Sequence, residues 1–438
     1  MDISFFGAAR EVGRSCIMVK ANNTAILLDA GVKLGKTEEY PVLDDKMLNK
    51  IDAIAITHAH LDHSGYLPHI YTAGYKGFAY MTKPTSELTA VLISDYMHIS
   101  NPENVSKEGL KMLASHQKAQ EYYKEFKIKG LQLRFIPAGH ILGSAMVEIK
   151  DLSSGEVLLY TGDINLYKTK LFNGADVKDL HATTLITEST YGSSQDIFPN
   201  EREVISKFIK SLNETIDRGG KAIIPSFAVG RAQEVLLILD DFINSGKLRK
   251  VPLYVDGMIN KAMRIHRHNV IYCRKELQSR ILQSEYDPFK SSNFVPIEKK
   301  EERSKIVNEE QSSIIVTTSG MLTGGPVMYY TEKLAGKDTT KMLLVGYQAE
   351  GTLGRELQDG AKKININRKD INVEMEVEAY HMSAHADRKQ LEELIGKVKG
   401  LENVFIIHGE KEKSESLKEY AKSNYNAVIP SIGKEYSV

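Results

Sequence analysis

The chain of 438 residues has no tryptophan and two cysteines, Cys16 and Cys273. Two thiols so far apart match no zinc-ligand spacing and no disulfide framework, which favours a reduced, intracellular protein. No apolar run approaches the ~20 residues of a membrane-spanning helix. The first residues also lack the basic and apolar parts of a signal peptide. The sequence therefore predicts a cytoplasmic protein with no membrane contact.

The chain also has no net charge, because its 57 Lys and Arg residues balance its 57 Asp and Glu residues. This balance argues against a surface coated with basic patches, but it does not exclude a local basic groove. Basic residues gather at 118–129, 247–250 and 362–363. Each of these clusters is interpreted first as solvated surface and only second as a path for nucleic acid.

The chain shows no repeat, low-complexity tract or long linker, although its length predicts two domains. The first ~190 residues read as short strands between turns, interrupted by helical stretches at 84–100 and 106–126. From about residue 200 a strand, a glycine-bearing loop and a helix follow one another four times, which predicts a parallel sheet flanked by helices. Strand character returns in the tail. We therefore expect an α/β protein in which residues 192–365 are inserted between 1–191 and 366–438.

The densest chemical signal is the segment His58-Ala59-His60-Leu61-Asp62-His63. It directly follows the apolar run 51–57, which reads as a buried strand, and it precedes a Ser-Gly turn. The strand fixes the backbone while the loop lets several side chains converge. Imidazole and carboxylate are good zinc ligands, and six residues can supply two neighbouring ions. A polar loop rich in histidine by chance is the alternative.

Four further polar residues stand where an apolar strand stops, often beside glycine. They are Asp29, His140, Asp163 and His408. Any one of them alone would more often be a structural residue. Together with the histidine segment they supply a full set of metal ligands.

These motifs resemble those of the metallo-β-lactamase superfamily, in its β-CASP branch. The resemblance covers essentially the whole chain and implies an αββα sandwich with an inserted Rossmann-like β-CASP domain. Two stretches, 10–16 and 225–234, are similar to the RNA-processing members. The matching positions are Asp29, the 58–63 segment, His140, Asp163, Glu188 in Thr-Glu-Ser-Thr-Tyr-Gly, His385 in Ser-Ala-His-Ala-Asp, and His408.

The resemblance implies a role for each matching residue. One Zn²⁺ would be held by His58, His60 and His140, and a second by Asp62, His63 and His408, with Asp163 between the two. Asp62 would also orient the attacking hydroxide, and Asp29 would steady the histidine segment without binding metal. Glu188 would orient His385, which would protonate the leaving oxygen or stabilise the phosphate.

Three classes of function compete. A zinc nuclease acting on RNA is favoured over a small-molecule hydrolase, because a small substrate needs no inserted domain as cover. The intact ligand set disfavours a catalytically inactive RNA-binding subunit. DNA-repair members of the branch typically carry Val at the position of His385, so this residue favours RNA.

One short segment bears on whether the enzyme attacks RNA ends or internal bonds. RNase J-like enzymes carry His-x-Ser-Gly-His, whose first His and Ser help to hold a 5′-monophosphate. This chain has His381-Met382-Ser383-Ala384-His385, while the processing endonucleases typically share only Ser-Ala-His. We therefore expect a 5′→3′ exoribonuclease, with an endoribonuclease of RNA 3′-end processing as the alternative. The structural alternative is that Ser383 only turns the loop and His381 packs on the sheet.

Loops that lead from strand ends into helices are natural phosphate sites. On that ground Arg231, Ser319 and Gly320 are predicted to contact the RNA backbone, unless the glycines of these loops only shape turns. The expected partner is RNA. A homodimer is compatible with the sequence, which does not determine the oligomeric state.

Overall fold

The computed structural model describes residues 1–35, 37–284 and 286–438, which form two compact units. Unit 1 comprises residues 1–197 and 384–438, and unit 2 comprises residues 198–383. The sequence-based boundaries fall at 191/192 and 365/366 instead. The strand at 376–379, which the sequence assigns to the last part of the first domain, pairs within the sheet of unit 2.

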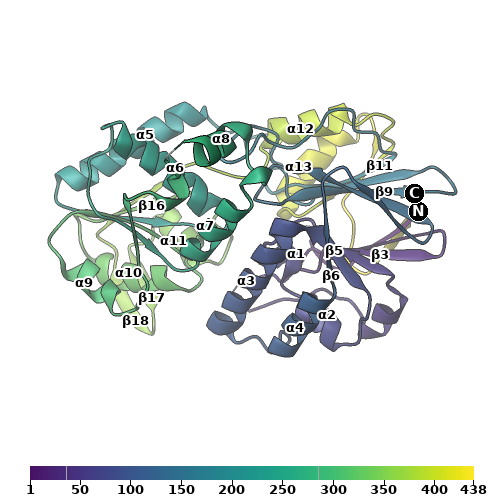
Figure 1. Ribbon diagram of the computed structural model, residues 1–438, viewed down its shortest axis with the longest axis horizontal. Coiled ribbons are helices and arrows are strands. Elements are labelled where there is room, and N and C mark those ends of the chain that lie inside the picture. The colour runs from purple at the N-terminus through teal and green to yellow at the C-terminus, as the bar shows by residue number, and fades with distance from the viewer. Residues whose placement is uncertain (36, 285) are drawn as a thin grey trace. The chain divides into compact units, whose positions relative to one another are not determined.

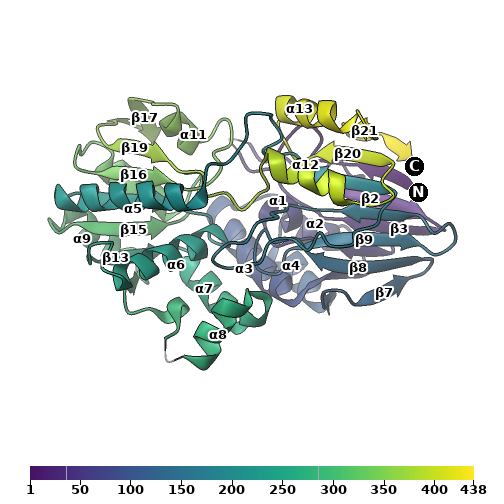
Figure 2. The same ribbon diagram turned by 90° about the horizontal axis from the view of Figure 1, so that it is seen from above.

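Unit 1 is built on two seven-stranded sheets (Figures 1 and 2). In the first sheet β3, β4, β5 and β6 run parallel, while β1 pairs antiparallel with both β2 and β22. Its order is β22 (Glu435–Ser437), β1 (Asp2–Phe5), β2 (Ile17–Ala21), β3 (Thr24–Leu28), β4 (Ala53–Ala55), β5 (Phe78–Thr82) and β6 (Gln117–Gln120).

The second sheet joins segments from both ends of the chain, because β11 pairs parallel with β10 on one side and with β20 on the other. Its order is β21 (Asn426–Val428), β20 (Asn403–Ile407), β11 (Thr184–Glu188), β10 (Val157–Tyr160), β9 (Ala145–Asp151), β8 (Leu131–Pro137) and β7 (Glu125–Ile128).

The two sheets pack face to face through a core that includes Phe5, Phe135 and Phe405. The outer face of each sheet is covered by helices through a further apolar core, which gives the expected αββα order of layers. The helical segments are η1 (Asp45–Lys50), α1 (Leu61–Ser64), α2 (Leu67–Thr72), α3 (Lys83–Ser100) and α4 (Lys107–Ser115) on the first sheet, and α12 (Arg388–Lys397) and α13 (Lys411–Ala421) on the second.

Local sequence explains where α3 begins and ends. The Thr82 hydroxyl accepts a hydrogen bond from the amide of Thr85, and Pro84 occupies the first turn, where a missing N–H costs nothing. Asn101 ends the helix in the left-handed region. The predicted helix at 84–100 is thus confirmed.

The helix predicted over 106–126 is wrong in its second half. It ends at Ser115, and β6 and β7 follow. In β7 the burial alternates, with Phe126 and Ile128 turned to the core and Lys127 exposed. This period of two is typical of a strand, and the richness in lysine concealed it.

Unit 2 is centred on a six-stranded sheet in which every pairing is parallel, as the repeated strand–loop–helix pattern predicts. Its central strands are entirely buried, which is the rule when both faces are covered. The order is β14 (Phe294–Pro296), β13 (Leu253–Asp256), β15 (Ser313–Thr317), β12 (Lys221–Pro225), β16 (Lys341–Leu344) and β19 (Glu376–Ala379).

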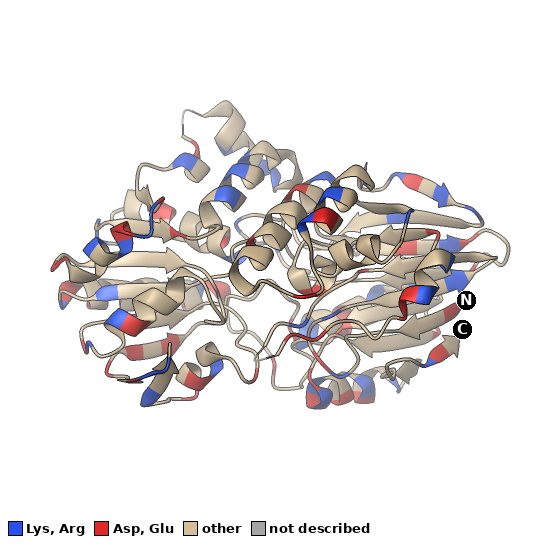
Figure 3. Cartoon of the chain, turned by 90° about the horizontal axis from the view of Figure 1, so that it is seen from below, with Lys and Arg blue, Asp and Glu red and all other residues tan. Residues whose placement is uncertain are grey.

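Helices cover both faces of this sheet (Figure 1). One face packs on α9, α10 and α11 through a core that includes Tyr330. A two-stranded hairpin adjoins the same core. Over much of both units, Lys and Arg are interspersed with Asp and Glu (Figure 3). The remaining elements are α5 (Glu201–Asp217), α6 (Arg231–Asn244), α7 (Ile259–His268), η2 (Val270–Tyr272), α8 (Lys275–Gln283), η3 (Pro288–Lys290), α9 (Glu302–Asn308), α10 (Pro326–Leu334), α11 (Leu353–Gln358), β17 (Lys363–Ile366) and β18 (Lys369–Asn372). Among the described residues, no helix is long and apolar enough to cross a membrane.

Candidate metal centre

The histidine segment leaves the sheet at the carboxyl end of β4 and enters α1. Asp29 stands at the end of the neighbouring strand β3, fully buried, with φ of 57°. Its carboxylate accepts hydrogen bonds from the amide and hydroxyl of Thr57, both at 2.8 Å, and from Nδ1 of His63 at 2.7 Å. The Tyr160 hydroxyl donates a further bond at 2.8 Å. Asp29 therefore fixes the backbone before the segment and one of its imidazoles.

The first ligand group contains His58, His60, His140 and Asp163, whose candidate ligand atoms all lie within 4.8 Å of one another. Nε2 of His58 is 3.5 Å from Oδ2 of Asp163, and Nε2 of His140 is 3.1 Å from Nδ1 of His60. The other ring nitrogens are held by the protein. Nδ1 of His58 donates to the Thr57 hydroxyl at 3.0 Å, and Nδ1 of His140 donates to the carbonyl of Ala384 at 2.9 Å. These bonds leave the Nε2 atoms turned toward one another.

The second group contains Asp62, His63, Asp163 and His408, again within 4.8 Å. Nε2 of His63 is 3.3 Å from Oδ1 of Asp163, and Nε2 of His408 is 3.5 Å from Oδ2 of Asp62. Nδ1 of His408 bonds the Ser15 hydroxyl at 2.9 Å. Asp163 thus turns one oxygen to each group.

Three buried atoms of this cluster have no hydrogen-bond partner within the described residues: Nε2 of His58, Oδ1 of Asp163 and Nε2 of His408. An unpaired polar atom in a protein interior costs about 1–3 kcal/mol, so three converging on one centre call for a further partner. Imidazole nitrogens and a carboxylate oxygen at this spacing suit one or two metal ions.

Electrostatics support the same conclusion for the imidazoles of the first group. Burial lowers the pKa of His58, His60 and His140, so these rings are neutral at pH 7 and offer a lone pair. For His63 burial also disfavours the charged ring, but the carboxylates of Asp163 and Asp29 outweigh it and raise the pKa.

A pair of residues, His385 and Glu188, adjoins the two ligand groups. Nδ1 of His385 lies 3.0 Å from the carboxylate of Glu188, and its ring centroid is 4.5 Å from that of His140. Glu188, at the end of β11, also accepts the amide of Ile164 at 2.7 Å. Burial lowers the pKa of His385, but Glu188 and then Asp163 outweigh it and raise the pKa to about 9. The structure therefore brings together all ten residues predicted for the centre: Asp29, His58, His60, Asp62, His63, His140, Asp163, Glu188, His385 and His408.

Sequence reasoning missed the supporting residues Ser15, Thr57 and Tyr160. Ser15 lies in the stretch 10–16 and Thr57 directly precedes the histidine segment, so both were within motifs already singled out. Their roles depend on which strand ends meet, and that information comes only from the fold.

The predicted phosphate-binding residues all lie in unit 2. Arg231, the first residue of α6, is 8% exposed. The Ser319 hydroxyl accepts from the amide of Thr323 and donates to the carbonyl of Gly324, so it stabilises its own loop. The carbonyl of Gly320 accepts from the side chain of Gln348 at 3.0 Å.

The loops after β12, β15 and β16 meet around Phe227. A Cβ atom at position 320 would come within 2.9 Å of the Phe227 ring, so Gly320 is required for packing. His381 is exposed and stacks on Phe198, with ring centroids 5.9 Å apart, while Ser383 is partly buried.

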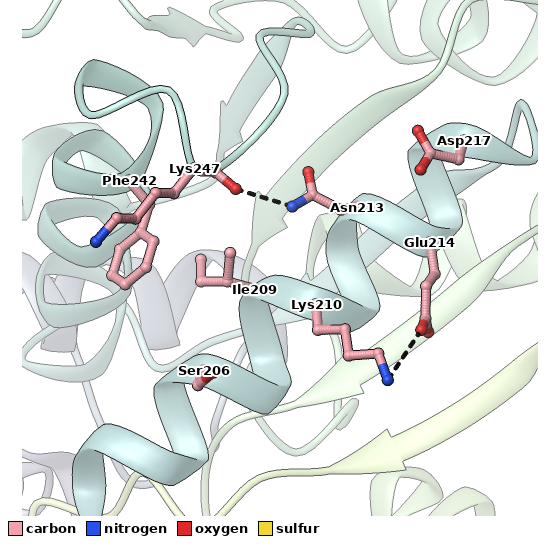
Figure 4. A pocket seen from close by; sticks show the side chains of 8 residues that line it. All are labelled: Ser206, Ile209, Lys210, Asn213, Glu214, Asp217, Phe242 and Lys247. Carbon is pink, nitrogen blue, oxygen red and sulfur yellow. Dashed lines mark hydrogen bonds and ion pairs between the residues drawn. The ribbon is translucent and has the colours of Figure 1, made fainter.

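A separate groove in unit 2 is lined by α5 and the end of α6 (Figure 4). Its charges are of both signs, and Lys210 pairs with Glu214 at 3.7 Å. The side chain of Asn213 donates to the carbonyl of Lys247. This groove therefore has neither the convergent ligands of a metal site nor the single sign of a phosphate site.

Three family models match the chain in succession. Residues 18–191 match the metallo-beta-lactamase superfamily domain, residues 232–357 the Beta-Casp domain, and residues 370–430 the Zn-dependent metallo-hydrolase RNA specificity domain.

Relatives of known name cover almost the entire chain. The transcription termination factor FttA of Methanocaldococcus jannaschii is 37% identical in an alignment of 426 positions that covers 94% of this chain and 67% of that protein. An RNase J-like protein of the same organism is also 37% identical, over 95% of this chain and 94% of its own length. The crystal structure of a protein of unknown function from Enterococcus faecalis V583 shares the fold, with a TM-score of 0.58 at 13% identity over 99% of both chains.

Proposed function

Because the chain belongs to the β-CASP family of metallo-β-lactamase-fold metallo-hydrolases, we propose that it is a zinc-dependent ribonuclease that hydrolyses RNA phosphodiester bonds. The observation that carries this proposal is the convergence of buried imidazole nitrogens and carboxylate oxygens on Asp163, three of which have no hydrogen-bond partner among the described residues. The RNA specificity domain at 370–430 and the RNase J-like relative support RNA as the substrate. Cytoplasmic RNA is the expected target.

The ligand split follows the two groups around Asp163. His58, His60 and His140 would hold one zinc ion, Asp62, His63 and His408 the other, and Asp163 both. When bound, the two ions would supply a hydroxide at neutral pH and withdraw charge from a phosphoryl oxygen.

The protein's own groups complete the reaction. Asp62 is partly exposed and can orient the attacking oxygen. His385 is held in place by Glu188, whose carboxylate raises its pKa, and can deliver a proton to the leaving ribose oxygen. Asp29 and Ser15 keep His63 and His408 in position.

We further propose that the enzyme acts 5′→3′ on RNA with a 5′-monophosphate. The similarity to the RNase J-like relative, 37% identical over 95% of this chain, and the segment His381-Met382-Ser383-Ala384-His385 support this proposal. The similarity to FttA favours the second candidate, an endoribonuclease that acts at RNA 3′ ends.

The test is metal content and cleavage of a labelled RNA. Purified protein should carry close to two zinc equivalents and lose activity to a chelator. Asp163→Ala should nearly abolish turnover, whereas Asp179→Ala, a matched change at an exposed residue, should not. Full RNA cleavage by Asp163→Ala would contradict the two-metal mechanism.

A further inference from the structure

Helix α7 of unit 2 concentrates positive charge in a chain with no net charge. Residues 257–275 contain no Asp or Glu, and half of the residues of α7 itself are Lys, Arg or His. Figure 3 shows Lys and Arg gathered on the part of unit 2 that holds α7 and α8.

Three of these side chains form one exposed face of the helix. Lys261, Arg264 and His268 are spaced by three and four residues, so they project from the same side, and all are exposed. We call these three residues the α7 stripe. None of them makes an ion pair with a residue that the structure describes, whereas nearby Arg267 pairs with Asp287 and Arg280 with Asp241.

Helix stability does not explain the stripe. Cations are favourable in the last turn of a helix, where its dipole is negative, and His268 lies there. Lys261 lies in the first turn, where a cation is unfavourable by about 0.3–1 kcal/mol. Nothing within α7 compensates this charge, which points to a ligand outside the chain.

The position of α7 indicates which ligand. The helix begins directly after β13, at the carboxyl edge of the parallel sheet, where ligands of open α/β sheets bind. Gly257 brings it against the next loop, because a Cβ there would lie 2.1 Å from the hydroxyl of Thr318. Lys261 therefore lies in the first turn of a helix that begins at this edge of the sheet.

We propose that the α7 stripe binds backbone phosphates of single-stranded RNA and carries the strand along α7 away from the sheet edge. This inference rests on the proposed function, since it assumes an RNA substrate. Lys offers a point charge and Arg a two-pronged donor for phosphate oxygens. Contacts of this kind hold any sequence alike.

The experiment measures RNA affinity apart from cleavage. Lys261→Ala with Arg264→Ala is compared with wild type by fluorescence anisotropy, on a 20-nucleotide unstructured RNA in chelator, over a range of KCl concentrations. Losing two phosphate contacts should reduce the slope of log K against log[salt] by about 1.4. The same slope predicts a loss of affinity of about 10- to 100-fold at 50 mM salt that vanishes toward 1 M.

The matched control is Lys107→Ala with Lys111→Ala, two exposed lysines on α4 of unit 1, with the same change in net charge. The control should bind RNA as wild type does. Wild-type affinity and slope in the α7 variant would overturn the inference and leave the stripe to another partner, such as an acidic protein. If wild-type protein neither binds nor cleaves RNA, the proposed function itself fails. Binding and cleavage by wild type with no effect of the α7 variant is a failure of this inference alone.

Discussion

At the scale of single residues, the orientation of the candidate ligands depends on side chains that are not ligands themselves. Thr57 accepts from His58 and donates to Asp29, which in turn holds His63. This chain of bonds sets which nitrogen of each ring is free, and only the correct tautomer offers its lone pair to a metal.

The pair formed by His385 and Glu188 should act as a unit. His385→Ala should lower kcat about 10²- to 10⁴-fold because proton delivery to the leaving oxygen is lost, with RNA affinity largely unchanged. Glu188→Gln should have a similar effect, and the double variant should be little worse than the more damaged single variant. Single-turnover cleavage and anisotropy measure the two quantities. The control is His98→Ala, a change at an exposed position. If the His385 and Glu188 variants lost only RNA affinity, the pair would bind substrate and not deliver a proton.

His266 should make unit 2 sensitive to acid. It is fully buried in α7, and burial lowers its pKa to about 4 from about 6.5. The unfolded chain therefore binds a proton that the folded chain does not between these values. Its stability contribution is fully present above pH 6.5 and decreases as the pH falls toward 4, by on the order of 3 kcal/mol.

Urea unfolding followed by far-UV circular dichroism measures this effect, since the chain has no tryptophan. His266→Leu should flatten the dependence between pH 4 and 6.5, while His268→Leu, at an exposed position of the same helix, should retain it. Parallel pH curves for His266→Leu and wild type would exclude this origin.

At the scale of elements, every candidate ligand comes after the end of a strand, either in the loop that follows it or, for Asp62 and His63, in the short helix α1. Strand ends could be located from the sequence because apolar runs stop at a polar residue beside glycine, as at Asp163 and His408. The sequence could not show which strand ends lie side by side. For example, β11 and β20 are neighbours in the sheet, although all of unit 2 separates them in the sequence. The prediction also missed the end of the helix at Ser115. The alternation of buried and exposed residues in β7 becomes visible only when Phe126 and Ile128 are known to face the core between the sheets.

The segment from β19 to His385 should recognise the 5′ end. His381→Ala with Ser383→Ala should remove a preference for 5′-monophosphate over 5′-triphosphate RNA, a loss of about 10- to 100-fold, as expected for one or two charge-assisted hydrogen bonds of ~1.5–3 kcal/mol. Internal cleavage should be spared. The measurement is the ratio of kcat/KM for the two RNAs, and equal use of both by wild type at internal sites would favour the endoribonuclease.

At the scale of the whole molecule, the candidate metal centre lies entirely within unit 1, while unit 2 has its own sheet and core. The motifs were enough to predict the inserted α/β unit and to select the residues that the structure gathers at the candidate centre, because these residues and the strand–loop–helix repeats occupy different parts of the chain. The compact unit runs from 198 to 383, whereas the predicted inserted domain runs from 192 to 365, and the pairing of residues 376–379 with β16 accounts for the difference at the second edge.

Zinc should therefore stabilise one unit selectively. In differential scanning calorimetry, metal at 100 times its Kd should add about 2.7 kcal/mol to the unfolding of unit 1 and leave unit 2 unchanged. In Asp163→Ala this increment should largely vanish. An equal upward shift of both transitions would show that the units unfold together.

The interrupted course of unit 1 also matters while the protein is being made. A ribosome releases β11 long before β20, and at about 5–20 residues per second the intervening residues 198–383 take about 10–40 s. Throughout that delay the nascent chain shows a bare strand edge that invites pairing with other chains. The same order of synthesis has a second effect: a fragment that ends before residue 385 lacks His385, the candidate proton donor, and His408, a candidate ligand, so the candidate centre stays incomplete until the chain is nearly finished.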